Sequence, residues 1–328
     1  MVAQYLTHAD LLSEVDTDVP LVVDLDGTLL LTDTLEESLV RSLFRNPFAI
    51  PRYFLALSGG RAAFKRQVAR GGHLPIETLP RREDLVDLLN REKAKNREIH
   101  LVTAADQQLA DDVATNLGVF HSTTGSDGRR NLKGPEKLYY LRERFPQGFI
   151  YAGDSSADLP VFLGARAAIL CDVGHATAAS IERAGIPVLA RLSRERRPLR
   201  DFLRALRPHQ WSKNLLIFLP LLLGHAFDEA TNIATAALAF VILCFVTSAT
   251  YLVNDISDLE ADRSHPTKRG RVFASGSLGI RWAVLAVPVM LGGAFAVAIA
   301  LSIPFAFLLG SYVVLTITYS LWIKRIAI

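Results

Sequence analysis

Two carboxylates stand two residues apart directly after a short run of β-branched residues. The run from Val19 to Val23 is followed at once by Asp24 and Asp26, in the order Asp-Leu-Asp-Gly-Thr. Residues two apart in an extended chain project from the same side, so both carboxylates can reach one substrate. One can attack a phosphorus atom, while the other protonates the leaving oxygen and later activates water. The pair therefore indicates phosphoryl-transfer chemistry.

Three further features follow along the chain in the order that this chemistry needs. Thr103 ends an apolar run and offers a hydroxyl and a backbone N–H to phosphate oxygens. Lys137, or as an alternative Lys133, can neutralise the charge of the transition state. Asp154 and Asp158 follow another apolar run, and such a carboxylate pair suits Mg²⁺.

These residues need strands that end at one common edge. Further strands are predicted over 99–102, 149–151, 168–171 and 186–189, separated by helical patterns over 106–116, 136–145 and 155–163. Alternating strands and helices are typical of a parallel sheet covered on both faces. We therefore predict an α/β, Rossmann-like domain over residues 1–190. Between about residues 32 and 95 the pattern changes to amphipathic helices without a strand, which predicts a helical cap.

Taken together, these motifs resemble those of the haloacid dehalogenase (HAD) superfamily over about residues 18–190. The resemblance implies that Asp24 is the nucleophile, Asp26 the general acid/base and Thr103 the phosphate-binding residue. It implies that Lys137 stabilises the transition state. It also implies a Mg²⁺ site built from Asp24, Asp26, Asp154 and Asp158.

Two other interpretations fit part of this pattern. A HAD-like domain can be kept as a non-catalytic regulatory module, but no motif position is visibly lost here. A P-type ion pump also forms an aspartyl phosphate, but its motif has a lysine after the nucleophile, where this chain has Leu25. Asp26 at the next position favours hydrolysis of the intermediate. The residues therefore favour a phosphohydrolase.

The second half of the chain has a different composition. Residues 211–328 hold only eight of the 36 Lys and Arg residues and six of the 33 Asp and Glu residues. Residues 233–253 and 282–323 carry no charge, and the second run is broken near Pro304. About 20 apolar residues cross a bilayer as a helix, so these runs predict three spans. Residues 214–227, with Pro220 and Gly224, form a shorter and marginal first span, which gives four.

The basic residues orient these four predicted spans. With the N-terminal domain in the cytoplasm, the outer loops keep only Asp228 and Glu229. The inner loops then carry Arg263, Lys268, Arg269, Arg271, Arg281, Lys324 and Arg325. An excess of Lys and Arg on the inner side is typical of cell membrane proteins. We therefore predict a multi-pass plasma membrane protein, with the N-terminal domain facing the cytoplasm.

Residues 191–213 are rich in arginine and join the two halves. Their place directly before an apolar stretch favours a basic juxtamembrane linker helix on anionic headgroups. A solvated linker helix is the alternative. The net charge of +3 is too small to argue for nucleic acid, so no nucleic-acid partner is expected.

Three aspartates follow the second predicted span. Asp255, Asp258 and Asp262 share one face if the segment is helical. Carboxylates clustered at a membrane boundary repel one another unless a cation holds them, and Mg²⁺ bridging to a diphosphate fits. A hydrophilic loop capping the span is the alternative. Lys268 and Arg271 can clamp phosphate or act as positive-inside anchors.

This segment resembles the first aspartate-rich motif of the UbiA prenyltransferase superfamily. The stretches 207–214 and 251–271 resemble its decaprenyl-phosphate phosphoribosyltransferase branch. The resemblance implies that a polyprenyl phosphate lipid is joined to phosphoribosyl pyrophosphate, with Mg²⁺ and loss of pyrophosphate. It implies a metal–diphosphate role for Asp255, Asp258 and Asp262. It implies substrate contacts for Asn254, Lys213, Lys268 and Arg271.

The chain departs from this family after Asp262. No Asp or Glu follows, whereas the family has a second aspartate-rich motif and about nine membrane helices. We therefore expect residues 214–328 to be the N-terminal part of an incomplete UbiA-like bundle, read from a longer protein. The favoured hypothesis is a Mg²⁺-dependent phosphatase acting on a phosphorylated substrate, fused to this transferase. A membrane-anchored phosphatase alone is the alternative.

Overall fold

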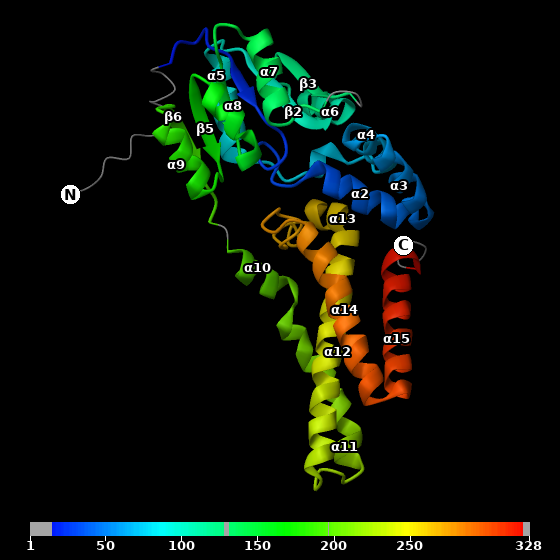
Figure 1. Ribbon diagram of the computed structural model, residues 1–328. Coiled ribbons are helices and arrows are strands. Elements are labelled where there is room, and N and C mark those ends of the chain that lie inside the picture. The colour runs from blue at the N-terminus through cyan, green and yellow to red at the C-terminus, as the bar shows by residue number, and fades with distance from the viewer. Residues whose placement is uncertain (1–14, 128–130, 196, 324–328) are drawn as a thin grey trace, which may run out of the picture. The chain divides into compact units, whose positions relative to one another are not determined.

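The computed structural model describes residues 15–127, 131–195 and 197–323 (Figure 1). The chain divides into two compact units, Met1–Glu195 and Arg196–Ile328. The predicted boundaries at residues 190 and 213 remain a prediction. Arg196, Lys324 and Arg325, which belong to the predicted basic segments, lie outside the described residues.

The first unit is built on one six-stranded parallel sheet. Its strand order is β3-β2-β1-β4-β5-β6. The strands are β1 Leu21–Val23, β2 Ile99–Asp106, β3 Ser122–Ser126, β4 Ile150–Gly153, β5 Ala167–Cys171 and β6 Val188–Leu192. The predicted α/β fold class is confirmed. The sequence did not predict β3, whose residues are small and polar and which lies at the edge of the sheet.

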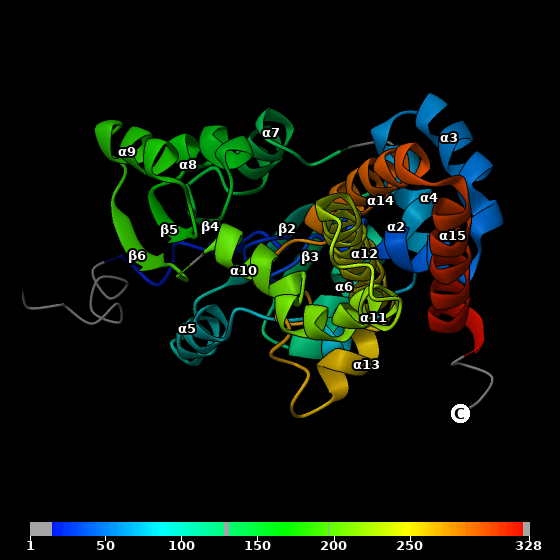
Figure 2. The ribbon, with the colours of Figure 1, turned by 90° about the horizontal axis from the view of Figure 1, so that it is seen from below.

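Helices cover both faces of this sheet (Figure 2). Leu21 and Val23 pack with one core, together with α5 Glu83–Ala94 and α6 Gln107–Leu117. Val22 points to the other core, with α7 Pro135–Arg144, α8 Leu159–Gly164 and α9 His175–Arg183. A strand with both faces buried explains why its residues are apolar without alternation.

The register of the central strands brings their carboxyl ends to one edge. Val23 pairs with Leu101 on β2 and with Ala152 on β4. Asp24 therefore comes level with Val102 and Gly153, directly before Thr103 and Asp154 on the two neighbouring strands. In open α/β sheets, this edge is where ligands bind.

The cap lies between β1 and β2 in sequence. It comprises α2 Thr34–Arg45, α3 Ile50–Ser58 and α4 Arg61–Gly71. These helices have their own small core around Tyr53 and Val68. α5 packs on the sheet instead, so the structural cap ends earlier than the predicted residue 95. The chain enters and leaves the cap through adjacent segments, since Leu31 N donates to Pro80 O over 2.8 Å.

The second unit is helical and apolar. Its main helices are α10 Pro198–Ala205, α11 Leu219–Leu223, α12 Ala230–Ser257, α13 Leu259–Ser264, α14 Arg281–Leu301 and α15 Ile303–Thr318. Among the described residues, three helices are long and apolar enough to span a membrane: Ala230–Ser257, Arg281–Leu301 and Ile303–Leu321. The length and composition of these helices indicate a membrane protein.

The predicted first span and linker helix differ from the structure. Residues 191–213 are not one helix, because α10 begins at Pro198 and a new 3-10 helix, η4, begins at Pro208. Proline fits the first turn of a helix but lacks the N–H that would continue one. Residues 214–223 belong to η4 Pro208–Phe218 and the short α11, and residues 224–227 follow α11, so 214–227 do not form one α-helix. η4 packs along α12, where Trp211 Nε1 donates to Ser248 Oγ over 3.0 Å.

Candidate functional site

Asp24 lies at the carboxyl end of β1, in the middle of the sheet. Its Oδ1 accepts a hydrogen bond from Leu25 N over 2.8 Å and lies 3.0 Å from Lys137 Nζ. Burial raises the pKa of Asp24 above its ordinary value, and the adjacent ammonium of Lys137 offsets part of that rise. The carboxylate is thus fixed in position and poorly solvated, as suits a nucleophile.

Lys137 lies on α7, and its side chain is 1% exposed. Its Nζ lies 3.5 Å from Asp158 Oδ1 and donates to Tyr151 Oη over 2.9 Å. Burial disfavours its charge, but the carboxylates of Asp24 and Asp158 outweigh burial and raise the pKa of Lys137. The residue predicted to stabilise the transition state thus lies beside the predicted nucleophile. Lys133 is exposed.

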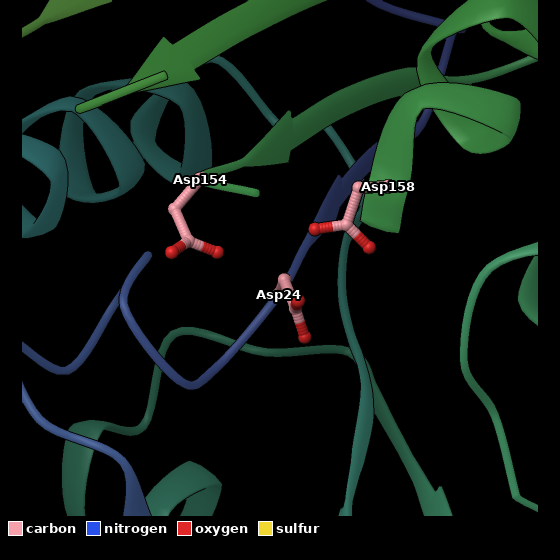
Figure 3. A group of neighbouring side chains, drawn as sticks. All are labelled: Asp24, Asp154 and Asp158. Atoms are coloured by element: carbon pink, nitrogen blue, oxygen red, sulfur yellow. The ribbon is translucent and has the colours of Figure 1, made fainter. Parts of the chain in front are cut away.

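Asp154 and Asp158 complete a group of three carboxylates with Asp24 (Figure 3). One oxygen from each of the three lies within 4.8 Å of the others. Asp154 follows β4, and Asp158 ends a short 3-10 turn in which Ser155 Oγ donates to Asp158 Oδ2 over 3.2 Å. Figure 3 shows the side chains directed toward one common space. This is the one such group among the residues that the structure describes.

The chemistry of these donors fits a hard divalent cation. All three ligand groups are carboxylates, and oxygen-only sites suit Mg²⁺ rather than metals that prefer nitrogen or sulfur. The loop after β1 adds to the site, because Thr28 Oγ1 lies 3.4 Å from Asp154 Oδ1. Asp26, which was also predicted as a ligand, is not part of the three-carboxylate group.

Asp26 points toward the beginning of the cap. Its Oδ1 accepts a hydrogen bond from Thr34 N, the first residue of α2, over 2.9 Å. Burial, with the nearby carboxylate of Asp33, raises the pKa of Asp26 well above its ordinary value. This rise in pKa favours the protonated form of the carboxyl group, which a general acid needs.

Thr103 lies in β2, beside β1, and is 1% exposed. Its Oγ1 accepts a hydrogen bond from Ala105 N over 3.1 Å. The next residue, Ala104, receives a hydrogen bond from the cap, because Lys65 Nζ donates to Ala104 O over 2.7 Å. Lys65 therefore links the cap to the strand end that carries Thr103.

Sequence reasoning missed three side chains that support this site. Tyr151 sits inside an apolar strand, so its type gave no polar signal. Lys65 is one of several basic residues in an amphipathic helix. Arg82 is 1% exposed and donates to Thr28 O over 2.9 Å and to Gly27 O over 3.1 Å. The sequence could have indicated Arg82 as a basic residue just after the point where the chain leaves the cap.

The aspartate-rich segment of the second unit is held by arginines. α12 ends at Ser257 and α13 begins at Leu259, with Asp258 between them. Arg271 Nη1 lies 2.7 Å from Asp262 Oδ2 and 3.4 Å from Asp255 Oδ1. The structure thus brings Asp255 and Asp262 to one guanidinium. The predicted metal role of Asp255, Asp258 and Asp262 stays a prediction.

Arg207 is a further partner that the sequence did not single out as a site residue. Its Nη2 is paired with Asp255, and its guanidinium carbon lies 5.1 Å from the Tyr251 ring centroid. Arg207 also adopts a left-handed backbone conformation, with φ of 53°. Such strain in a residue other than glycine persists where surrounding contacts enforce it.

The remaining predicted substrate contacts differ in their environment. Lys213 lies in η4 and Lys268 in the segment after α13, and both are exposed. Asn254 is partly buried near the end of α12, where its carbonyl accepts from Asp258 N over 3.0 Å.

Comparisons with known proteins concern both units. Residues 215–328 match the UbiA prenyltransferase family, which confirms the predicted resemblance for this part of the chain. The chain is 42% identical over 313 residues to the uncharacterized protein y4nM of Sinorhizobium fredii, covering 95% of this chain and 61% of that protein. It is 49% identical over 108 residues to a decaprenyl-phosphate phosphoribosyltransferase of Corynebacterium glutamicum, covering 32% of this chain and 30% of that protein.

The chain therefore spans about three fifths of the length of the first of these relatives, and the match to the second covers less than a third of it. Among solved structures, a predicted phosphoglycolate phosphatase from Haemophilus somnus aligns with 53% of this chain and 85% of its own, at 15% identity and a TM-score of 0.31. A likeness at that level carries no conclusion about function.

Proposed function

We propose that the first unit is a Mg²⁺-dependent phosphohydrolase that works through an aspartyl phosphate on Asp24. The observation that carries this proposal is the convergence of Asp24, Asp154 and Asp158 within 4.8 Å, with Lys137 Nζ 3.0 Å from Asp24. A buried site with three carboxylates and one ammonium suits a phosphate monoester, whose charge needs both metal and lysine.

The side chains divide the reaction between them. Asp24 attacks the phosphorus atom, and the phosphoryl group passes to its carboxylate as the ester oxygen leaves. Asp26 protonates that leaving oxygen, consistent with its raised pKa, and then takes a proton from the water that hydrolyses the intermediate. Lys137 stabilises the charge that develops on the phosphoryl oxygens. Thr103 binds one of those oxygens from the neighbouring strand.

Asp24, Asp154 and Asp158 would hold the Mg²⁺ ion. When bound, Mg²⁺ neutralises phosphate charge and orients the phosphoryl group. Gly27 brings the backbone of the β1 loop close to Asp154, which keeps the cation site compact. Arg82 also holds this loop, through hydrogen bonds to the carbonyl groups of Gly27 and Thr28.

For the second unit we propose a role in a UbiA-type transferase that joins a polyprenyl phosphate to phosphoribosyl pyrophosphate. The family match of residues 215–328 supports this role. Asp255, Asp258 and Asp262 would bind the diphosphate through Mg²⁺, and Asn254, Lys213, Lys268 and Arg271 would contact phosphate oxygens. The phosphatase would then remove the 5-phosphate from the lipid-linked product. Both sites would face the cytoplasm of a multi-pass plasma membrane protein.

The phosphatase proposal is tested with the full chain, purified in detergent. Phosphate release is measured from p-nitrophenyl phosphate and from polyprenyl-phosphoryl phosphoribose, with Mg²⁺ and with EDTA. We expect release with Mg²⁺ only, and a loss of about 10³-fold or more in Asp24→Asn, because the nucleophile is removed. Release that Asp24→Asn leaves unchanged would contradict the proposal. Release from the aryl ester but not the lipid would reject the lipid substrate alone.

A further inference from the structure

The ammonium of Lys137 has three N–H groups, and the structure gives it three oxygen acceptors. These are Asp24 Oδ1 at 3.0 Å, Tyr151 Oη at 2.9 Å and Asp158 Oδ1 at 3.5 Å. Because the Lys137 side chain is 1% exposed, bulk water does not replace any of the three. Each N–H group of the Lys137 ammonium therefore has one acceptor. Tyr151 supplies the one neutral acceptor among the three.

The contact with Tyr151 is a hydrogen bond rather than a cation–π interaction. Lys137 Nζ lies 5.5 Å from the centre of the Tyr151 ring but only 2.9 Å from its hydroxyl oxygen. The ammonium therefore lies beyond the hydroxyl end of the ring and not over its face. Tyr151 therefore contacts Lys137 through its hydroxyl oxygen, which acts as a hydrogen-bond acceptor.

The tyrosine ring is held on several sides. Tyr151 lies on β4 and is fully buried. Its ring meets Phe162 edge-on, with 5.0 Å between the ring centroids and 76° between the planes. A Cβ on Gly153 would lie 2.6 Å from the ring, so the backbone of β4 also closes on it. The hydroxyl oxygen therefore has little freedom to move.

We propose that Tyr151 is a positioning residue that holds the Lys137 ammonium between Asp24 and Asp158, nearer to Asp24. This proposal rests on the phosphohydrolase proposed above. A neutral hydroxyl satisfies the third N–H without adding negative charge and without competing for the cation. A third carboxylate there would pull the ammonium away from Asp24. An apolar ring would leave the N–H without an acceptor, and the ammonium would shift toward the carboxylates.

Tyr151→Phe removes this hydroxyl and keeps the ring. Asp24 and Asp158 would then be drawn more tightly to Lys137, away from the phosphorus atom and the cation. In the full chain, we expect kcat for p-nitrophenyl phosphate to fall about tenfold or more, with KM within about threefold. Tyr140→Phe is the matched control, because its hydroxyl is hydrogen-bonded at 2.9 Å to Thr124 Oγ1, on the edge strand β3. It should leave both constants unchanged.

A double-mutant cycle tests whether Tyr151 acts through Lys137. Mn²⁺ affinity, measured by electron paramagnetic resonance, is the readout, so the result does not depend on turnover. The carboxylates bind Mn²⁺ in place of Mg²⁺. We expect Tyr151→Phe to weaken Mn²⁺ binding about fivefold in the unaltered background. In a Lys137→Met background it should have no further effect, because no ammonium is left to position.

Three outcomes overturn the proposal. They are an unchanged kcat and Mn²⁺ affinity in Tyr151→Phe, an equal loss in Tyr140→Phe, or the same loss of affinity with and without Lys137. If the unaltered chain releases no phosphate at all, the proposed function fails, and the Mn²⁺ cycle still decides the role of Tyr151. If Tyr151→Phe does not fold alone, folding of the Tyr151→Phe, Lys137→Met double variant would support the proposal, because the unsatisfied N–H is then absent. Failure of both variants to fold would also overturn it.

Discussion

Gly27 and Asp154 approach so closely that a Cβ atom on Gly27 would lie 2.2 Å from Asp154 Oδ2. Gly27 also has a φ of +76°, a conformation that side chains disfavour. Two separate constraints therefore act at this position. Gly118 has a similar φ of +63°, but nothing lies within 4 Å of a Cβ added there. The two glycines separate the effect of backbone strain from the effect of the close approach.

Gly27→Ala is expected to displace the Asp154 carboxylate and lower phosphatase activity about 100-fold, because the cation loses a ligand position. Gly118→Ala is the control. It should cost about 1 kcal/mol of stability through backbone strain alone and keep its activity. Steady-state phosphate release and Mn²⁺ titration measure the difference. Equal activity of the two variants would show that the close approach to Asp154 has no catalytic role.

Arg82 makes a buried ion pair with Asp172, 2.7 Å apart, with side chains 1% and 3% exposed. Arg82→Met leaves the Asp172 carboxylate without this partner, although Arg194 stays 3.1 Å away. We expect a loss of about 3 kcal/mol, at the low end for a broken buried pair, because Arg194 compensates part of the Asp172 charge. Hydrogen exchange of the β4 amides reports the free energy of opening of this unit.

Arg191→Met is the matched control for Arg82→Met. Arg191 pairs with Glu182 at the surface, and both side chains are about half exposed. A pair of this kind contributes about 0–1 kcal/mol, so the β4 amides should exchange nearly as before. If both substitutions lowered the free energy of opening by a similar amount, burial of the Arg82–Asp172 pair would not explain its contribution to stability.

Arg271 is expected to fix the segment that follows the aspartate-rich helix end. Arg271→Gln removes the guanidinium shared by Asp255 and Asp262, and Asp262 is 2% exposed. Backbone amides over 259–280 should then exchange about tenfold faster, because a buried carboxylate loses its ion pair. Lys268→Gln, at an exposed position of the same segment, should leave exchange unchanged. Unchanged exchange in Arg271→Gln would contradict this view.

His100 gives the first unit a pH dependence of stability. It is 3% exposed, its Nδ1 lies 2.7 Å from Ser122 Oγ, and burial lowers its pKa from the ordinary value of 6.5. The unfolded chain therefore binds a proton at this residue at higher pH than the folded chain does. As pH falls below about 6.5, the free energy of unfolding therefore decreases. This decrease levels off once the pH is below the pKa of His100 in the folded state.

The expected result is a urea midpoint that falls between pH 7 and pH 5, measured by pulse proteolysis of the first unit. His100→Gln should reduce this pH dependence, because the titrating group is gone. His73→Gln, at an exposed position in the cap, should keep it. A midpoint that changes with pH equally in all three proteins would assign the effect to other groups.

Two of the candidate site residues were predictable because each directly follows a strand. Asp24 and Asp154 follow neighbouring strands, and a parallel sheet brings them to one edge whatever the intervening sequence. Thr103 was expected to end its strand, but β2 continues to Asp106. Lys137 was chosen over Lys133 from the helix that begins at Pro135. Strand order and cap extent were not predictable, since both depend on packing between distant segments.

The features missed by sequence depend on tertiary contacts. β3 is polar because it lies at a sheet edge, so it carries no apolar pattern. Tyr151 looks like an ordinary strand residue until Lys137 is placed beside its hydroxyl. Arg207 is one of many arginines in a basic stretch, and only its pairing with Asp255 separates it from the others.

The 3-10 helix η4 changes how far a short segment reaches. Its 11 residues advance about 2.0 Å each, and with the five α-helical residues of α11 they extend about 30 Å. The hydrocarbon layer of a bilayer is also about 30 Å thick, whereas 16 residues of α-helix would reach about 24 Å. Tighter winding therefore replaces added residues, so that these 16 residues match in length what an α-helix reaches only with about 20.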